Sequence, residues 1–137
     1  MTSLFYSNYQ NFTPTYTNIS LGDGSCDCRY TQRYKSIHVE YKITLGTGFS
    51  IGANPTLTLP RPLRNTEQVG SFRGMAHDLD ADEYFELSAD ANTTTSFIIG
   101  HIHVDGQEMK SIPITATDPF TFAVGDKITI SGTYETA

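Results

Sequence analysis

Several features that would assign a functional class are missing from this chain of 137 residues, which has no tryptophan, two cysteines and 18% charged residues. Two cysteines exclude a disulfide-rich scaffold, and a chain of this length buries enough surface to fold without a metal or a disulfide. The longest apolar run, at residues 97–99, is far too short to cross a bilayer. The first residues lack the basic segment and long apolar stretch of a signal peptide. We therefore expect a soluble single domain that is made in a cytoplasm.

Clusters of basic residues are missing as well. The formal net charge is −6, and six of the fifteen acids lie between Asp78 and Asp90, a segment without lysine or arginine. The other nine acids are balanced by nine lysine and arginine residues. Nucleic-acid binding requires a basic surface that neutralises phosphates, and anionic membranes attract the same kind of surface. We expect neither nucleic acid nor a membrane as a partner.

What the chain does contain favours β-strands. Threonine, serine, asparagine and glycine are abundant, and there are eight tyrosines and eight phenylalanines. The clearest strand is predicted at residues 36–45, where apolar and polar side chains alternate without a break, so that one side faces a core and the other faces water. Eight or nine short strands are predicted in all, at residues 13–20, 25–32, 36–45, 56–59, 69–76, 83–87, 96–104, 112–115 and 127–134.

Glycine and proline mark the boundaries between these strands. The sequence Gly22-Asp23-Gly24 predicts a hairpin turn, and the glycines at 46, 48 and 52 predict a loop. Prolines at 55, 60 and 62 confine the next strand to residues 56–59, and Pro113 weakens the strand at 112–115. The pattern predicts an all-β fold, an antiparallel β-sandwich of jelly-roll type with eight or nine strands. Residues 1–11 are predicted to be an N-terminal arm, and residues 12–137 a single domain.

Four segments of the chain, read in order, resemble a domain that is common in actinobacterial tailed phages and prophages. Residues 12–24, FTPTYTNISLGDG, are similar to the opening YTPTWTNVTLGNG of that domain, and residues 29–32, RYTQ, are similar to its GRYxQIGKxV. Residues 55–60 resemble its SLP strand end, and residues 119–135, PFTFAVGDKITISGTYE, resemble its ending PFTWATGDxLxISGTYE. Tyr16 and Phe122 stand where that domain has tryptophan, and it has no counterpart of Cys26, Cys28 or the acidic segment.

The resemblance implies a small virion structural protein, of the kind described as minor tail, fibre-tip or head-surface proteins, with a trimeric jelly-roll architecture. It implies a non-enzymatic capsid decoration protein that docks as a homotrimer on other virion proteins, is assembled in the host cytoplasm and resides in the virion. The alternative is a tail or fibre-tip module that recognises a host surface glycan. No cofactor is expected. The nearby carboxylates of Asp80 and Glu83 offer a glycosidase pair only in principle, and no nucleophile elbow or phosphate-binding glycine loop is present.

Aromatic side chains near the start of the chain are the first candidate binding residues. Phe5, Tyr6, Tyr9 and Phe12 are mixed with asparagine, serine and glutamine in and beside the arm. We predict that they dock onto a neighbouring subunit or onto the particle. A frayed terminus is the alternative.

Two loops are the candidate receptor contacts. They contain Phe49 and the acids Asp78, Asp80, Asp82 and Glu83. Alternating carboxylates suit calcium, but the twelve-residue calcium-loop pattern is missing because no glycine occupies its sixth position. The sequence favours a solvated acidic loop that steers docking onto a basic partner.

Two pairs of metal-binding residue types are spaced two apart, so each pair shares one side of a strand. His101 and His103 could supply ligands to a metal ion at a three-fold axis of a trimer. The favoured interpretation is two ordinary strand histidines, one of them paired with a carboxylate. Cys26 and Cys28 are predicted to be free thiols, because side chains two apart on a strand rarely meet disulfide geometry. Their alternative role is a cross-link between subunits.

Overall fold

The computed structural model describes residues 8–66, 72–106 and 108–137, and these contain β-strands but no α-helix. The strands are β1 (Gln10–Asn11), β2 (Tyr16–Ser20), β3 (Ser25–Arg33), β4 (Ser36–Thr44), β5 (Ser50–Thr58), β6 (Arg73–Asp78), β7 (Glu83–Ala91), β8 (Ser96–Asp105), β9 (Glu108–Pro113) and β10 (Lys127–Glu135). Within the described ranges, no helix has the length and apolar character needed to cross a membrane.

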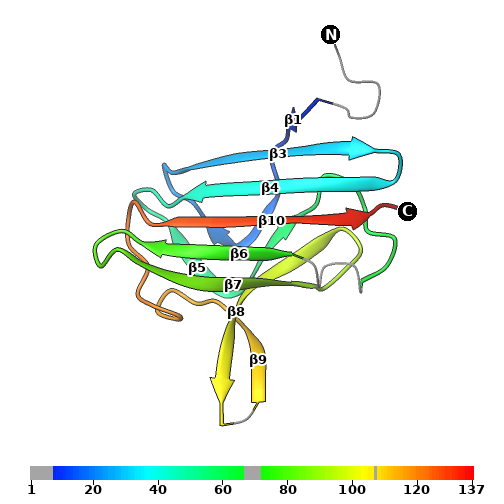
Figure 1. The fold of residues 1–137 in the computed structure, drawn as a ribbon. Coiled ribbons are helices and arrows are strands. Elements are labelled where there is room, and N and C mark those ends of the chain that lie inside the picture. The colour runs from blue at the N-terminus through cyan, green and yellow to red at the C-terminus, as the bar shows by residue number, and fades with distance from the viewer. Residues whose placement is uncertain (1–7, 67–71, 107) are drawn as a thin grey trace.

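The strands form one antiparallel sheet that curls over on itself into two layers. Neighbours along the sheet follow the order β1-β3-β4-β10-β6-β7-β8-β5-β2, and β9 pairs with β8. Strands β3, β4, β10, β6 and β7 form the front layer in Figure 1, and β5 and β2 lie behind it. This arrangement confirms the predicted all-β, antiparallel, jelly-roll-like sandwich.

Strand β8 joins the layers because it has three partners. Its first half pairs with β7 on one side and with β5 on the other, and its second half pairs with β9. The β8–β9 hairpin projects from the body of the sandwich, as Figure 1 shows. Ile102 and Met109 on this hairpin are 36% and 73% exposed.

The alternation in β4 and β10 places the core. Inward residues of β4 are at most 1% exposed, whereas the residues between them are half-buried or exposed, and β10 repeats this pattern beside it. The register aligns the two sets, for example Tyr41 with Ile130 and Ile43 with Ile128. Further inward side chains come from β6, β7, β8 and the back layer, namely Ala76, Leu87, Ala89, Phe97, Ile99, Leu57 and Ile19.

Aromatic rings link the layers through the core. Tyr41 meets Phe97 edge-on, with ring centroids 5.3 Å apart, and Phe97 meets Phe72 at 5.7 Å. The Tyr41 hydroxyl donates to the carbonyl oxygen of Thr58 at 2.8 Å, and the Tyr134 hydroxyl donates to that of Arg61 at 2.7 Å. Each buried hydroxyl is therefore hydrogen-bonded, as burial of a polar group requires.

The predicted hairpin at residues 22–24 is a turn of a different kind. It connects β2 with β3, but β2 pairs with β5 and β3 pairs with β4, so the turn crosses from one layer to the other. Gly22 has a φ of +62°, and a Cβ atom there would collide with the backbone of Thr47. Glycine is required because the turn packs directly on the loop after β4.

Three strand predictions are corrected by the structure. Strand β5 begins at Ser50, so the glycine-rich loop is shorter than predicted, and Pro55 is accommodated because the β2–β5 register shifts beside it. The predicted strand at 112–115 lies earlier, as β9, with Pro113 at its end. The strand predicted at 69–76 is observed as β6 at 73–78, and residues 69–71 lie outside the described ranges.

The described end of the predicted arm belongs to the sheet. Gln10 and Asn11 form β1, opposite Tyr30 and Arg29 of β3, and the Phe12 amide donates to the carbonyl oxygen of Cys28 at 3.0 Å. Residues 8–12 therefore run along the edge of the front layer.

Candidate functional site

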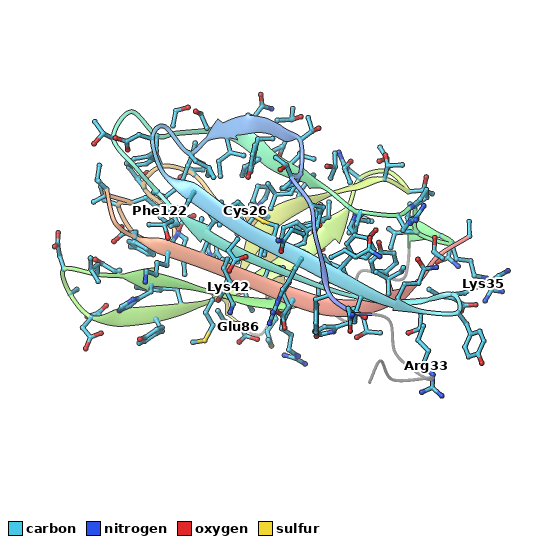
Figure 2. The ribbon with its side chains drawn as sticks, turned by 90° about the horizontal axis from the view of Figure 1, so that it is seen from above. Cys26, Arg33, Lys35, Lys42, Glu86 and Phe122 are labelled. Carbon is cyan, nitrogen blue, oxygen red and sulfur yellow. A yellow bond between two sulfur atoms is a disulfide. The ribbon has the colours of Figure 1, made fainter. Side chains whose placement is uncertain are left out.

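The outward side of the front layer is the most organised polar surface among the described residues. We call this side of β3, β4, β10, β6 and β7 the outer face. Strand register places its side chains in rows that cross the strands. Row 1 consists of Arg29, Glu40, Ser131 and Arg73, and row 2 consists of Asp27, Lys42, Thr129, Met75 and Glu86. Figure 2 shows Lys42 and Glu86 on the same side of this layer.

A trough of about 520 Å³ runs along β10 on the outer face. Its middle is formed by the short side chains of Thr129 and Ser131, and longer side chains from the flanking strands rise on either side. Lys42 stands on the β4 side, and Met75 and Glu86 stand on the β6–β7 side. A concave surface of this volume is in the range of protein binding sites.

One wall of the trough is held by a network around Glu40. The Arg29 Nε donates to Glu40 Oε2 at 2.8 Å, and His38 Nε2 lies 3.5 Å from Glu40 Oε1. The hydrogen bond from Arg29 lowers the pKa of Glu40, so this carboxylate stays ionised. The other ring nitrogen of His38 lies 3.0 Å from the Thr133 hydroxyl. These contacts fix the β4 side of the face.

Tyr9 extends this network toward the sheet edge. The Arg29 guanidinium lies 4.3 Å from the centre of the Tyr9 ring, and the same ring meets His38 edge-on. Tyr9 remains 45% exposed. The predicted partner-binding Tyr9 therefore stands on the outer face.

The opposite wall is more open. Arg73 and Glu86 form an exposed ion pair at 3.3 Å, and Met75, which is 47% exposed, lies between Glu86 and the middle of the trough. Asp27 and Lys42 are cross-strand neighbours, but neither forms an ion pair within the part of the chain that the structure describes. The outer face thus has one wall tied by hydrogen bonds and one wall of exposed side chains.

A second candidate surface lies at the end of the sandwich where β4 and β6 finish and β10 begins. The Asp126 side chain is buried and accepts hydrogen bonds from the amides of Leu79 at 2.9 Å and Ala123 at 2.7 Å. The backbone of Asp126 also binds Leu45, which begins the loop that contains Phe49. One buried residue, through its carboxylate and its backbone carbonyl, thereby brings together the two loops that the sequence predicted as receptor contacts.

The predicted contact residues in these loops differ in exposure. Phe49 is half-buried against the core, whereas Asp80 and Glu83 are exposed. Asp82 binds His77 at 2.9 Å, and Asp78 accepts a weak hydrogen bond from the Ala81 amide at 3.4 Å. Asp80 and Glu83 make no such contact within the described residues, so their carboxylates face solvent.

The other predicted partner-binding residues are placed as follows. Phe12 packs edge-on against Tyr30 and Tyr41, with ring centroids 5.7 and 5.5 Å apart, so its ring serves the core of the same chain. Phe5 and Tyr6 lie outside the described residues.

The histidine pair is divided by the structure. His101 is 5% exposed, and its Nε2 lies 3.1 Å from Asp118 Oδ2, as the favoured interpretation of one histidine paired with a carboxylate predicted. The side chain of His103 lies outside the described set. Among the described residues, no group of three or more histidine, cysteine, aspartate or glutamate side chains is arranged to hold a metal ion.

The cysteine prediction is corrected. Cys26 and Cys28 lie on the inward side of β3 with their Cα atoms 5.6 Å apart, and the structure pairs their sulfur atoms as a disulfide. A cross-link between subunits would require these thiols to leave their pairing within the chain.

Sequence reasoning missed the outer face as a site. The alternation in β4 predicted that His38, Glu40 and Lys42 face water, but not that Glu40 and Lys42 line one trough with residues of β6 and β7. The strand order brings these residues together, and no local motif encodes it. Comparisons with protein families, with curated proteins and with solved structures find no match for this chain.

Proposed function

We propose that this chain is a non-enzymatic surface component of a tailed-phage particle, a capsid decoration protein that docks as a homotrimer on other virion proteins. The outer face is the observation that carries the proposal. It offers a concave trough with Arg73 and Met75 at its rim and Arg29 held beside it by Glu40, and arginine and methionine are enriched in protein interfaces. The virion location and the trimeric state are inferred from the resemblance to actinobacterial phage domains.

The carboxylates of the outer face favour binding over catalysis. Glu40 is engaged by Arg29 and Glu86 by Arg73, and the ion pair keeps the pKa of Glu40 low. A general acid needs a carboxyl whose pKa is raised toward neutrality. Glu40 is tuned in the opposite direction, which suits a structural ion pair.

Immunogold electron microscopy of the parent phage, with an antibody against this chain, tests the proposal. Label over the head supports a decoration protein, and particles assembled without this chain serve as the control. Label at the tail end supports the receptor-binding alternative. Intact particles that carry no label, while the antibody still detects the free protein, contradict the virion role.

The receptor-binding alternative is supported by the loop end. Asp126 joins the Phe49 loop to the acidic turn, so residues far apart in the sequence form one surface. Surface glycans presented on an array test this alternative. Specific binding that is lost in Asp80→Ala but kept in Lys35→Ala, at the opposite end of the sheet (Figure 2), would favour it.

A further inference from the structure

We propose that the outer face binds the outer face of a second copy of this chain, about a two-fold axis that crosses the strands between row 1 and row 2. Such a contact is isologous, because the same surface serves both partners. The two sheets would stack face to face at the usual separation of about 10 Å. The inference goes beyond the proposed function and does not require a role in a virion. It competes with that function for one surface, because an outer face covered by a second copy is not open to other virion proteins.

Charge balance favours a second copy as the occupant. The two rows contain three acids and three bases, which are Asp27, Glu40, Glu86, Arg29, Lys42 and Arg73. These rows are therefore neutral, although the whole chain carries a formal charge of −6. Two copies that repel each other overall meet with the least repulsion through a neutral surface.

The order of charges along each strand makes the face complementary to itself. The two-fold axis lays row 1 of one copy over row 2 of the other. Arg29 then faces Asp27 of the second copy, and Glu40 faces its Lys42. Arg73 faces Met75 of the second copy, beside its Glu86. Each contact occurs twice, and no like charges oppose each other in these rows.

The other two-fold axis in the plane of the sheet gives a worse match. An axis along β10 would lay β3 over β7 of the second copy. Asp27 would then face Glu86, and Lys42 would face Met75, so the one favourable contact, Glu40 against Arg73, is offset by the repulsion between the two carboxylates. Opposed like charges cost free energy, so the axis across the strands is favoured.

The proposed contact also supplies partners that a single chain lacks. Asp27 and Lys42 form no ion pair within the described chain, and each acquires an opposite charge from the second copy. The two troughs face each other along β10, and the long side chains of Lys42, Arg73 and Met75 stand at their rims and can turn inward to fill them. Exposed ion pairs contribute little binding free energy individually. The charges therefore determine how the two copies align more than how tightly they bind.

A charge swap between two variants tests the inference. In K42E the two copies would place glutamate against Glu40, and in E40K they would place lysine against Lys42, so each variant repels itself. A mixture of K42E with E40K restores opposite charges at every position. We expect sedimentation velocity to show a wild-type dimer, a roughly tenfold or greater loss of self-association in each variant, and a heterodimer in the 1:1 mixture.

Lys35→Glu is the matched control, because Lys35 is exposed in the β3–β4 turn, away from the outer face (Figure 2). It makes the same change of charge and should leave the dimer intact. Circular dichroism checks that each variant is folded. If E40K does not fold, a mixture of the single variants D27K and R29E repeats the charge swap on β3.

Three results would overturn the inference: a wild-type protein that stays monomeric at several hundred micromolar, a mixture that fails to associate, or a trimer indifferent to all of these charges. A trimer of that kind would leave the proposed virion role standing, whereas unlabelled particles would remove that role and leave the dimer. The two proposals therefore fail separately.

Discussion

The inner and outer faces of β4 and β10 alternate along the same two strands, yet they have different physical roles. Inward side chains such as Ile37 and Ile43 are at most 1% exposed and contact one shared core. Outward side chains such as Glu40 and Lys42 line an open trough. Neighbouring residues in the sequence therefore contribute to different properties, stability on one side and recognition on the other, and substitutions should separate the two.

The largest effect is expected from Phe97→Ala. This ring is fully buried between Tyr41 of the front layer and Phe72, so its removal leaves a cavity where the layers meet. We expect the free energy of unfolding to fall by about 3–5 kcal/mol, measured by denaturant titration. A loss below about 1 kcal/mol would show that the inner face is not the shared core.

The next effect is expected at a buried polar side chain. Asp126→Ala removes the acceptor of two amide hydrogen bonds, from Leu79 and Ala123, and leaves these donors without it. We expect a loss of about 2–3 kcal/mol and faster hydrogen exchange at both amides. Asp80→Ala, in the exposed turn nearby, is the control and should change neither quantity. Equal effects from the two variants would contradict the role assigned to Asp126.

Tyr134→Phe sharpens the comparison through pH. Burial raises the pKa of Tyr134 to about 12, above the ordinary value of 10 that applies in the unfolded chain. A raised pKa means that the folded state holds the proton more tightly, so this stabilisation is complete below about pH 10 and is lost as pH rises toward 12. The variant lacks the hydrogen bonds to Arg61, so its free energy of unfolding should be lower by about 1 kcal/mol at neutral pH. Between pH 10 and 12 that free energy should also fall less steeply than in the wild type, as measured by denaturant titration at each pH.

The free energy of unfolding of Tyr134→Phe will still fall somewhat between pH 10 and 12, because burial also raises the pKa of Tyr41. Tyr34→Phe is the control, since Tyr34 is 86% exposed. If both variants respond alike to alkaline pH, burial of Tyr134 is not the cause of the slope.

The smallest effect on stability is expected at the outer face. Lys42→Ala and Thr129→Ala remove exposed side chains that flank and line the trough, and we expect the free energy of unfolding to change by no more than about 0.5 kcal/mol in dilute protein. The measurement is the same denaturant titration used for Phe97→Ala. A loss comparable to a core substitution would remove the distinction between the two faces.

The positions of strands were predictable wherever one face of the strand is exposed to solvent and the other is buried. The alternation at residues 36–45 predicted β4 almost to its ends, and residues 127–134 predicted β10, because burial on one side enforces a period of two. Prediction was weaker where partners decide the strand. β5 extends through Pro55 because β2 pairs with it across a register shift, and β9 exists because β8 continues beyond the body.

The candidate residues divide in the same way. The sequence identified Tyr9 and the acidic turn as exposed, and it anticipated that one histidine would pair with a carboxylate, because these expectations depend on local chemistry. It did not identify Asp126, whose role depends on amides that come from other loops. It also expected free cysteines, because an ideal strand does not show how closely Cys26 and Cys28 approach.

The sequence by itself determined the all-β class, the alternating strands at the centre of the front layer and the concentration of negative charge in one segment. Composition and period are local properties, and each is visible in a short window. Only the tertiary structure decided the order of the strands, and with it the rows that place Glu40 and Lys42 of β4 across β10 from Arg73 and Met75 of β6. Strand order depends on pairings between distant residues, so the outer face exists only in the folded chain.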